Sequence, residues 1–432
     1  MPQPMLCLDA EVRQFAERFR SVFSKPQYEY FVTVLLGLLE CEGRRTLSGI
    51  VSKVAQPPSL SGLSRFLARS PWMAEALVVI WLERFRTEME PLVEAEREQQ
   101  RQSQLKRRGR PKDPFVTGYL SGDDSTMSKP KGRTMEGLGK HHSTTHEQRV
   151  VGHSLVAGLY VLLDRRCPLA PQLYRQENVC ASEEVVFQSK IALMETFIRT
   201  FQPVVGTRTH VLLDSWYCAK CLWRAARDRE FLITTGLKSN RWLRIPDDTV
   251  PQGWRWLKLS DYLASLSEHD FGQMSWPRGG KAVYVHVVTT RVRKLYCCQV
   301  VIVRHSLSAP LSQARYWASS DLEADTATLL AHLSARWDIE VLFADGKEEL
   351  GLDHYQLMSA QALVRFWTLA MLVYVFLEEE QHRLQVRWQR SVTLGEARRE
   401  IQRRHHHRLL CWLHEQFLSG VHPDTLGDLL AA

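Results

Sequence analysis

The chain has 432 residues, of which 44% are hydrophobic and 24% are charged. These values are typical of a folded globular protein, exclude a disordered chain, and allow two or three domains. The 56 Lys and Arg residues outnumber the 48 Asp and Glu residues, and the net charge of +8 makes a polyanionic partner plausible. No apolar run is long enough to span a membrane and no secretion signal is recognisable, so we expect a cytoplasmic protein without a membrane partner.

The nine cysteines are scattered along the chain, which argues against a disulfide framework. Only Cys218 and Cys221 have the spacing of a zinc-binding pair, and no second pair or His-x-x-x-His partner completes a site with them. We therefore expect reduced thiols, in agreement with a cytoplasmic location.

Residues 1–105 have apolar residues at three- and four-residue spacing, which predicts a helical domain. Pro57 and Pro58 separate two short helices, and the second of these carries Arg65. One interpretation is a DNA-binding helix-turn-helix that places its second helix in a major groove, with Arg65 as a contact. The other is an ordinary helical bundle with a basic rim.

Residues 106–114, KRRGRPKDP, form a strongly basic segment. Its Arg-Gly-Arg-Pro core resembles the AT-hook, an extended peptide whose arginines enter a narrow A/T minor groove. This resemblance makes Arg108, Arg110 and Lys112 predicted DNA contacts. The alternative is a basic linker that touches DNA phosphates without reading sequence.

Strands alternate with helices over residues 115–244, which predicts a mixed α/β sheet with helices packed on it. One strand runs into Asp123 and Asp124, and a short apolar strand ends at Asp214. A helix between these strands is expected to have Ser182 as its N-cap. Because sites in such sheets form at the carboxyl ends of strands, two aspartates at strand ends can share one pocket.

Residues 245–320 are predicted to form an antiparallel β insertion, because their segment KAVYVHVVTTRVRKLYCCQVVIVRH is rich in strands with no helix between them. Helical patterns return over residues 321–375, the second part of the core, which carries Glu340. Residues 376–432 are predicted to form a basic, helical carboxy-terminal region. The expected fold class is therefore α/β, with a sheet core, a β-rich insertion and helical segments at both ends.

Three carboxylates, Asp124, Asp214 and Glu340, are the predicted metal ligands. Hard oxygen ligands of this kind can bind two Mg²⁺ ions roughly 3.5–4 Å apart, an arrangement suited to phosphodiester chemistry. Asp123 is the alternative first ligand, because neighbouring strand residues face opposite sides of a sheet and only one of the two points into the site.

Two cations flank Glu340 at helical spacing. Arg336 lies four residues before it and Lys347 seven after it, so the three side chains lie on nearly one line along a helix. We predict that both cations grip DNA phosphates on either side of the metal site. A solvated helix face with an ordinary ion pair is the alternative. The basic loop after Asp124 adds Lys131 as a further predicted DNA contact.

The pattern of Arg336, Glu340 and Lys347 within RWDIEVLFADGK resembles the signature of DDE insertion-sequence transposases, most closely the insertion-sequence-four clan. The segments SGDDST and VLLDSWY resemble the two aspartate motifs of that clan, and the resemblance covers roughly residues 60 to 375. It implies an RNase H-like core and catalytic, metal-binding roles for Asp124, Asp214 and Glu340. It also implies two Mg²⁺ ions, with Mn²⁺ as a substitute.

The resemblance further implies the activity and the partners. Such an enzyme binds terminal inverted repeats and target DNA, cuts the element ends, and transfers the freed strands in cut-and-paste transposition. It implies a homodimer in a paired-end complex and a bacterial, nucleoid-associated location. The alternatives are a non-catalytic DNA-binding regulator derived from a transposase, and an RNase H-like structure-selective nuclease.

Two features of this sequence relate less directly to the clan. Leu333 occupies the position where the clan usually has a Tyr that helps to hold the cleaved DNA end. Related enzymes carry a Trp in the β insertion that supports a flipped base, and Trp317 lies nearest the matching place. The competitors for this role are Trp254, Trp256 and Trp276, and the alternative for all four is core packing.

Overall fold

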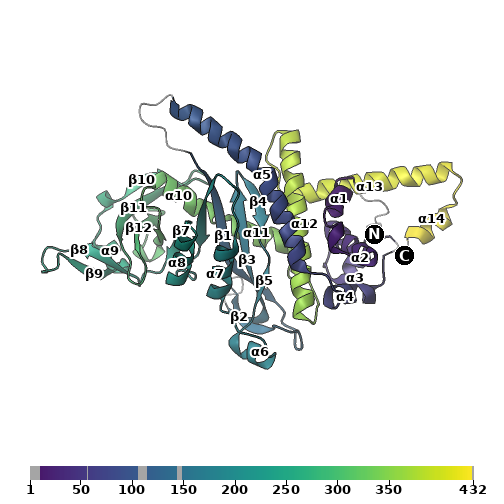
Figure 1. Ribbon diagram of the computed structural model, residues 1–432, viewed down its shortest axis with the longest axis horizontal. Coiled ribbons are helices and arrows are strands. Elements are labelled where there is room, and N and C mark those ends of the chain that lie inside the picture. The colour runs from purple at the N-terminus through teal and green to yellow at the C-terminus, as the bar shows by residue number, and fades with distance from the viewer. Residues whose placement is uncertain (1–9, 56, 106–113, 144–147, 431–432) are drawn as a thin grey trace.

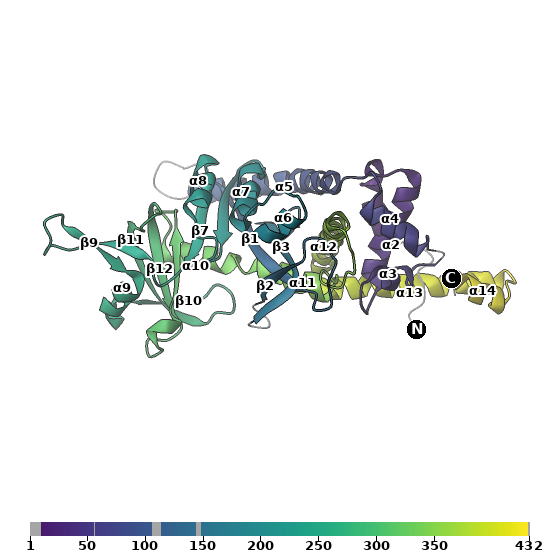
Figure 2. The same cartoon turned by 90° about the horizontal axis from the view of Figure 1, so that it is seen from below.

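The computed structural model describes residues 10–55, 57–105, 114–143 and 148–430. The molecule has a large sheet at its centre, a β-rich part at one end and a helical part at the other (Figures 1 and 2). Arg108, Arg110 and Lys112, predicted to contact the minor groove, lie outside the described residues.

The central sheet has 11 strands, and nine of them follow the order β10-β11-β12-β13-β7-β6-β1-β3-β2. Its middle part consists of β1 Val116–Ser128, β2 Gly139–Ser143, β3 Gln148–Leu162, β6 Thr207–Leu213 and β7 Leu232–Leu237. The short strands β4 Arg165–Pro168 and β5 Gln172–Tyr174 both pair with β3. Strand β1 is antiparallel to β3 and parallel to β6, which is in turn parallel to β7. This mixed sheet confirms the predicted α/β fold with an RNase H-like core.

The β-rich insertion continues the central sheet. Its strands are β10 Gly272–Ser275, β11 Ala282–Arg291, β12 Cys297–Arg304 and β13 Arg315–Ser319, and β13 pairs antiparallel with β7. A separate two-stranded sheet is formed by β8 Trp242–Pro246 and β9 Trp254–Lys258, followed by helix α9 Leu259–Ser265. The insertion is antiparallel, as predicted, but it shares backbone hydrogen bonds with the core sheet.

Helices cover both faces of the sheet. One face carries α7 Lys190–Thr200 and α8 Lys220–Asp228, and the other carries α10 Thr326–Ala335, α11 Asp338–Glu348 and α12 Ala360–Trp388. Side chains of β3 alternate between these two layers: Val156 belongs to the core with α7 and α8, whereas Ala157 belongs to the core with α11 and α12. This alternation decides which face each side chain of the neighbouring strand β1 joins.

Helix α7 begins later than the sequence indicated. The predicted N-cap at Ser182 is wrong, because Ser182 is the last residue of the short helix α6 Glu177–Ser182. The side chain of Ser189 caps α7 instead, accepting a hydrogen bond from the backbone N–H of Ala192. This start places Lys190 at the first turn of α7, beside the sheet.

The amino- and carboxy-terminal helices form one unit. It contains α1 Ala10–Glu17, α2 Lys25–Glu40, α3 Leu47–Val51, α4 Leu60–Ala68 and α5 Ala74–Leu105, together with α12, α13 Leu394–Leu418 and α14 Pro423–Leu430. The rings of Phe15 and Phe376 lie 5.0 Å apart, and one hydrophobic core joins residues of α1 to α5, α12 and the sheet. Arg65 lies exposed on α4, which packs against α12, and its predicted DNA contact stays a prediction.

Helix α12 is the central helix of this unit. Among the described residues it is the one helix long and apolar enough to cross a membrane, and 83% of its most apolar window is buried within the protein. Its burial against α2, α4, α5 and α13 accounts for its apolar composition.

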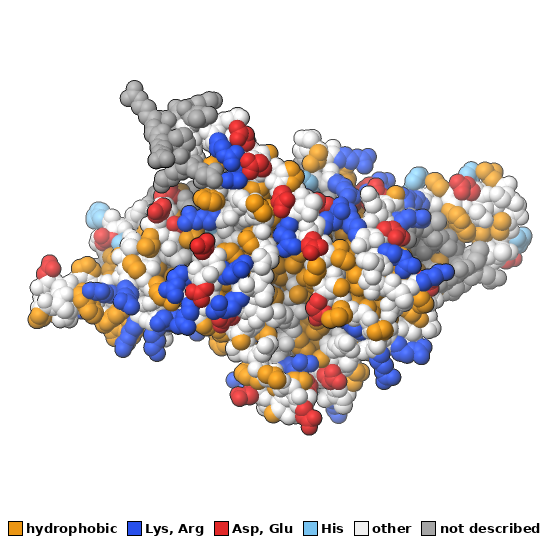
Figure 3. Space-filling model, viewed as in Figure 1, with side chains coloured by type: hydrophobic (Ala, Val, Ile, Leu, Met, Phe, Trp, Pro, Cys, Tyr) orange, Lys and Arg blue, Asp and Glu red, His pale blue; other side chains and the backbone are white. Residues whose placement is uncertain are grey.

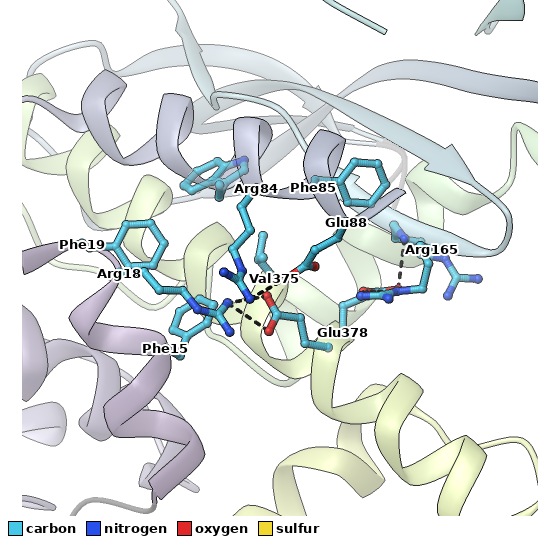
Figure 4. Close-up of a pocket in the computed structure, with 12 residues that line it drawn as sticks. Phe15, Arg18, Phe19, Arg84, Phe85, Glu88, Arg165, Val375 and Glu378 are labelled. Atoms are coloured by element: carbon cyan, nitrogen blue, oxygen red, sulfur yellow. Dashed lines mark hydrogen bonds and ion pairs between the residues drawn. The ribbon is translucent and has the colours of Figure 1, made fainter. Parts of the chain in front are cut away.

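Ion pairs tie α12 to its neighbours around a small cavity (Figure 4). Arg18, in the turn after α1, donates to Glu379 at 2.7 Å, and Arg165 of β4 donates to Glu378 at 3.0 Å. Charged groups around the cavity thus pair with one another between the turn after α1, β4 and α12. We regard the cavity as a junction between helices and sheet.

A buried carboxylate fixes the start of α11. Asp338 is 2% exposed and accepts hydrogen bonds from Arg166 of β4 at 2.9 Å and from Arg278 of the β10–β11 turn at 2.5 Å. One side chain therefore joins α11 to the core sheet and to the insertion.

Replacing Asp338 with Ala should lower the free energy of unfolding by about 3 kcal/mol, because two arginines lose their buried partner. Urea denaturation followed by circular dichroism measures this change. The control is Glu195→Ala, which removes an exposed pair with Arg199 and should cost less than about 0.5 kcal/mol. Equal losses in the two variants would contradict the anchoring role of Asp338.

Candidate active site

The two adjacent aspartates of β1 point to opposite faces of the sheet. Asp124 pairs with Val156 and Asp123 with Ala157, and cross-strand partners share a face. Asp123 therefore lies on the side of α10 and α11, whereas Asp124 lies on the side of α7 and α8.

Asp214 follows the last residue of β6. In the parallel register Gly122 pairs with Leu213, so one further step brings Asp123 beside Asp214. The carboxylate of Asp214 accepts backbone N–H groups of Trp216 at 2.9 Å and Tyr217 at 3.2 Å, which fix its orientation. The predicted strand-end position of Asp214 thus brings it next to the carboxylates of β1.

Glu340 lies in the first turn of α11, on the face of the sheet that carries Asp123. The guanidinium of Arg336 donates to the Glu340 carboxylate and lies 3.9 Å from the carboxylate of Asp123. The positive charge of Arg336 also counteracts the raised pKa of Asp214. Arg336 therefore interacts with three carboxylates, Asp123, Asp214 and Glu340, which we call the acidic cluster.

Burial and mutual repulsion perturb this cluster. Burial, and next the charge of Asp214, raise the pKa of Asp123 to about 7, against an ordinary value of 3.8. Burial also raises the pKa of Asp214. Carboxylates that resist ionisation in this way gain stability from a nearby cation. A divalent metal ion would supply the charge that the single guanidinium of Arg336 only partly provides.

Asp124 has different partners. Its carboxylate pairs with Lys190 of α7 and accepts hydrogen bonds from the Tyr217 hydroxyl at 2.9 Å and from the Ser154 hydroxyl at 3.3 Å. Since the backbone N–H of Tyr217 binds Asp214, this buried tyrosine connects Asp124 to the Asp214 loop. The strand register and the contact with Arg336 favour Asp123 as the residue that shares a site with Asp214 and Glu340. Asp124 lies on the opposite face of β1, where its charge still raises the pKa of Asp123 and of Asp214.

The other predicted contact residues lie in different surroundings. Lys347 lies in the last turn of α11, where burial lowers the pKa of its amine. Lys131 is exposed in the turn after β1. Trp317 of β13 packs against the cluster of buried residues that includes Val301 and Leu333. Leu333, at the usual Tyr position, is thus part of a small hydrophobic core.

Two further tryptophans, which were not predicted as site residues, are exposed beside the acidic cluster. Trp216, two residues after Asp214, is 61% exposed, and Trp337, next to Arg336, is 54% exposed. In the sequence, both tryptophans could have been found because one follows the aspartate of the second aspartate motif and the other lies within the Arg-x-x-x-Glu motif. An exposed indole beside a carboxylate cluster offers a flat surface for stacking.

An open groove begins at Trp216. It is lined by Ser215, Trp216, Cys218, Lys238, Asn240, Arg241, Trp242, Arg293 and Lys294, and we call it the basic groove. Lys238 lies over the Trp216 ring, 5.5 Å from its centroid. Lys and Arg side chains also gather over α8 and the adjoining β-rich part of the molecule (Figure 3). A positive surface therefore leads away from Asp214.

Two family models match this chain. Residues 18–256, more than half of the chain, match the model described as DDE superfamily endonuclease. The chain belongs to this DDE superfamily. Residues 188–376 match the Transposase DDE domain, so the two matches together span all the candidate carboxylates. Both matches are thus to families of DDE nucleases and transposases.

A comparison with solved structures finds a piggyBac transposase in a synaptic complex with hairpin DNA. The TM-score is 0.38 and the sequence identity 9%, and the match covers 66% of this chain and 51% of that chain. This chain therefore matches about half the length of that transposase. No curated protein matches the chain.

The raised pKa of Asp123 predicts an unusual pH dependence of stability in the absence of divalent metal. The folded state retains a proton between pH 3.8 and about 7 that the unfolded state releases, so this residue makes the free energy of unfolding fall as pH rises through that range. The slope approaches at most about 1.4 kcal/mol per pH unit.

The measurement is urea denaturation in EDTA at several pH values, comparing the wild type with Asp123→Asn. The difference in unfolding free energy, wild type minus variant, should decrease steadily from pH 4 to pH 7 and then level off. Two curves that stay parallel would contradict the raised pKa.

Proposed function

We propose that this protein is an insertion-sequence transposase that cuts DNA at the ends of its element and transfers the freed strands to target DNA. The observation that carries the proposal is the acidic cluster: Asp123, Asp214 and Glu340, with Arg336 among them. The sequence predicts Asp124 as the first ligand, with Asp123 as the alternative, and the strand register supports Asp123.

The three carboxylates suit Mg²⁺, with Mn²⁺ as a substitute, because these hard cations prefer oxygen ligands. A pair of such ions, when bound, activates the attacking oxygen and stabilises the leaving oxygen of a phosphodiester. The protein's own groups set the geometry: two backbone N–H groups orient Asp214, and the ion pairs of Asp338 fix the helix that carries Glu340.

Arg336 has two roles in this proposal. In the metal-free protein its guanidinium offsets the repulsion within the acidic cluster. When metal ions neutralise the carboxylates, the same guanidinium becomes available for a phosphate next to the scissile bond, for which its planar fork is suited. Lys347, two helical turns beyond Glu340 on α11, supplies a second positive charge.

The basic groove provides a path for a DNA strand that leaves the acidic cluster. Its Lys and Arg side chains can attract a phosphate backbone whatever the base sequence. Trp216, at the entrance of the groove, offers a surface on which a base can stack. This groove, rather than Trp317, is our candidate for holding an unpaired end, because Trp317 packs against a buried cluster.

We further propose a homodimer that pairs two element ends, with terminal inverted repeats and target DNA as partners in a bacterial cytoplasm. The two alternatives, a regulator without catalysis and a structure-selective nuclease, differ in the products that they make. A regulator binds without cutting, and a structure-selective nuclease cuts without joining strands.

The adjacent aspartates provide a matched pair for testing the first ligand. Asp123→Asn should abolish Mg²⁺-dependent cleavage of a labelled duplex carrying the DNA that flanks this gene, a loss of at least about 10³-fold, because an amide cannot replace a ligand carboxylate here. Asp124→Asn should retain measurable cleavage, since its contacts with Lys190 and Tyr217 act on the cluster indirectly.

Denaturing gels measure the cut strands, and binding of the uncut duplex is measured in parallel to confirm that both variants are folded and bind DNA. Loss of cleavage in Asp124→Asn with activity retained in Asp123→Asn would restore Asp124 as the ligand. Binding without any cut by the wild type, under both Mg²⁺ and Mn²⁺, would favour the regulator.

Trp216→Ala should weaken binding of element-end DNA with a single-stranded overhang by about 5- to 100-fold, because one base loses its stacking partner. Trp216→Phe keeps an aromatic face and should recover most of the affinity. Fluorescence anisotropy of labelled DNA at fixed salt measures both. The same affinity for the Ala variant and the wild type would exclude Trp216 as a stacking platform.

A further inference from the structure

Two histidines and an aspartate meet between the sheet and α10, away from the acidic cluster. His210 lies on β6, His332 lies on α10, and Asp321 lies in the loop between β13 and α10. One ligand atom from each residue lies within 4.8 Å of the other two. His210 precedes Asp214 by four strand residues, which separates the two positions by about 13 Å.

Both histidines have a buried ring nitrogen without a hydrogen-bond partner. These are Nδ1 of His210, a residue that is 0% exposed, and Nε2 of His332, which is 4% exposed. A buried polar atom without a partner lowers the stability of the folded protein, so such atoms are rare and often mark the site of a bound ion or water. The two rings lie close together, with centroids 4.1 Å apart.

The opposite nitrogen of each ring is engaged. Nε2 of His210 lies 2.8 Å from the hydroxyl of Thr234, and this hydroxyl itself donates to Ser319. Thr234 must therefore accept the proton of His210 Nε2, which leaves Nδ1 with a free lone pair. Nδ1 of His332 lies 3.2 Å from the hydroxyl of Tyr119. Contacts of this kind orient metal-binding imidazoles in known sites.

Asp321 completes the group. Its Oδ1 accepts the backbone N–H groups of Glu323 and Ala324, both at 3.2 Å, which orient the carboxylate. Its Oδ2 lies 3.9 Å from Nε2 of His332, too far for a hydrogen bond. The free carboxylate oxygen and the two free imidazole nitrogens thus surround one position.

We propose that His210, His332 and Asp321 bind a Zn²⁺ ion that joins α10 to the sheet. Two imidazoles and one carboxylate are typical zinc ligands, and a water molecule would complete a tetrahedral set. Ligand atoms of such a set lie about 3.4 Å apart, so the observed separations of at most 4.8 Å require a contraction of no more than about 1.4 Å. Mg²⁺ is disfavoured, because it prefers oxygen ligands in octahedral geometry.

The position of this ion relates it to the acidic cluster. His210 lies on the strand that ends at Asp214, and His332 lies one helical turn before Arg336. Tyr119, which contacts His332, lies on the strand that carries Asp123. The ion would thus hold the elements that bring the acidic cluster together, without itself contacting DNA.

The experiment uses the full chain, stripped with EDTA and titrated with Co²⁺ and Zn²⁺ in excess Mg²⁺. The wild type should show the intense visible absorption of tetrahedral Co²⁺ and retain about one Zn²⁺ per chain after gel filtration. Asp321→Ala should bind Zn²⁺ at least tenfold more weakly, and His332→Ala should lose the Co²⁺ absorption.

His153→Asn is the matched control, because His153 is also fully buried but both of its ring nitrogens have partners, Tyr355 and Glu136. This variant should retain the Co²⁺ absorption, as should the double variant Asp123→Asn with Glu340→Gln. Absence of tetrahedral absorption in the wild type would overturn the proposal whatever the variants do. Unchanged Zn²⁺ affinity in Asp321→Ala would overturn it as well. Neither readout requires cleavage of DNA.

Discussion

The structure of this protein depends on gathering three carboxylates, two of which, Asp123 and Asp214, repel each other. Asp123, Asp214 and Glu340 come from three elements, and the guanidinium of Arg336 contacts or offsets all of them. The arrangement costs stability in the absence of metal, as the raised pKa of Asp123 indicates. The packing of α10 and α11 on the sheet must supply that stability, and the buried ion pairs of Asp338 are part of this support.

Much of this site could be predicted from the sequence. The Arg-x-x-x-Glu spacing predicted the contact between Arg336 and Glu340, and the short apolar strand placed Asp214 at its end. The predicted single helix through both residues is wrong, because Arg336 lies in the turn between α10 and α11. The alternation of strands and helices predicted the α/β sheet, which the structure confirms. These features depend on local periodicity, which a single sequence displays directly.

Other features depend on contacts between distant segments. The choice between Asp123 and Asp124 follows from the register of β1 with β3 and β6. Because helices cover both faces of β1, hydrophobic alternation along the strand does not show which aspartate faces the site. The N-cap at Ser189 was missed because Ser182 precedes an equally acceptable pattern. The exposure of Trp216 and the partial burial of Trp317 depend on which surfaces the insertion covers, which composition does not reveal.

The most direct test of the central claim is anomalous diffraction from crystals of the full chain soaked in Mn²⁺. We expect anomalous peaks bound by the carboxylates of Asp123, Asp214 and Glu340, with Arg336 displaced from the cluster and Asp124 still paired with Lys190. Peaks bound by Asp124 on the opposite face of β1, with Arg336 still in contact with Glu340, would contradict it.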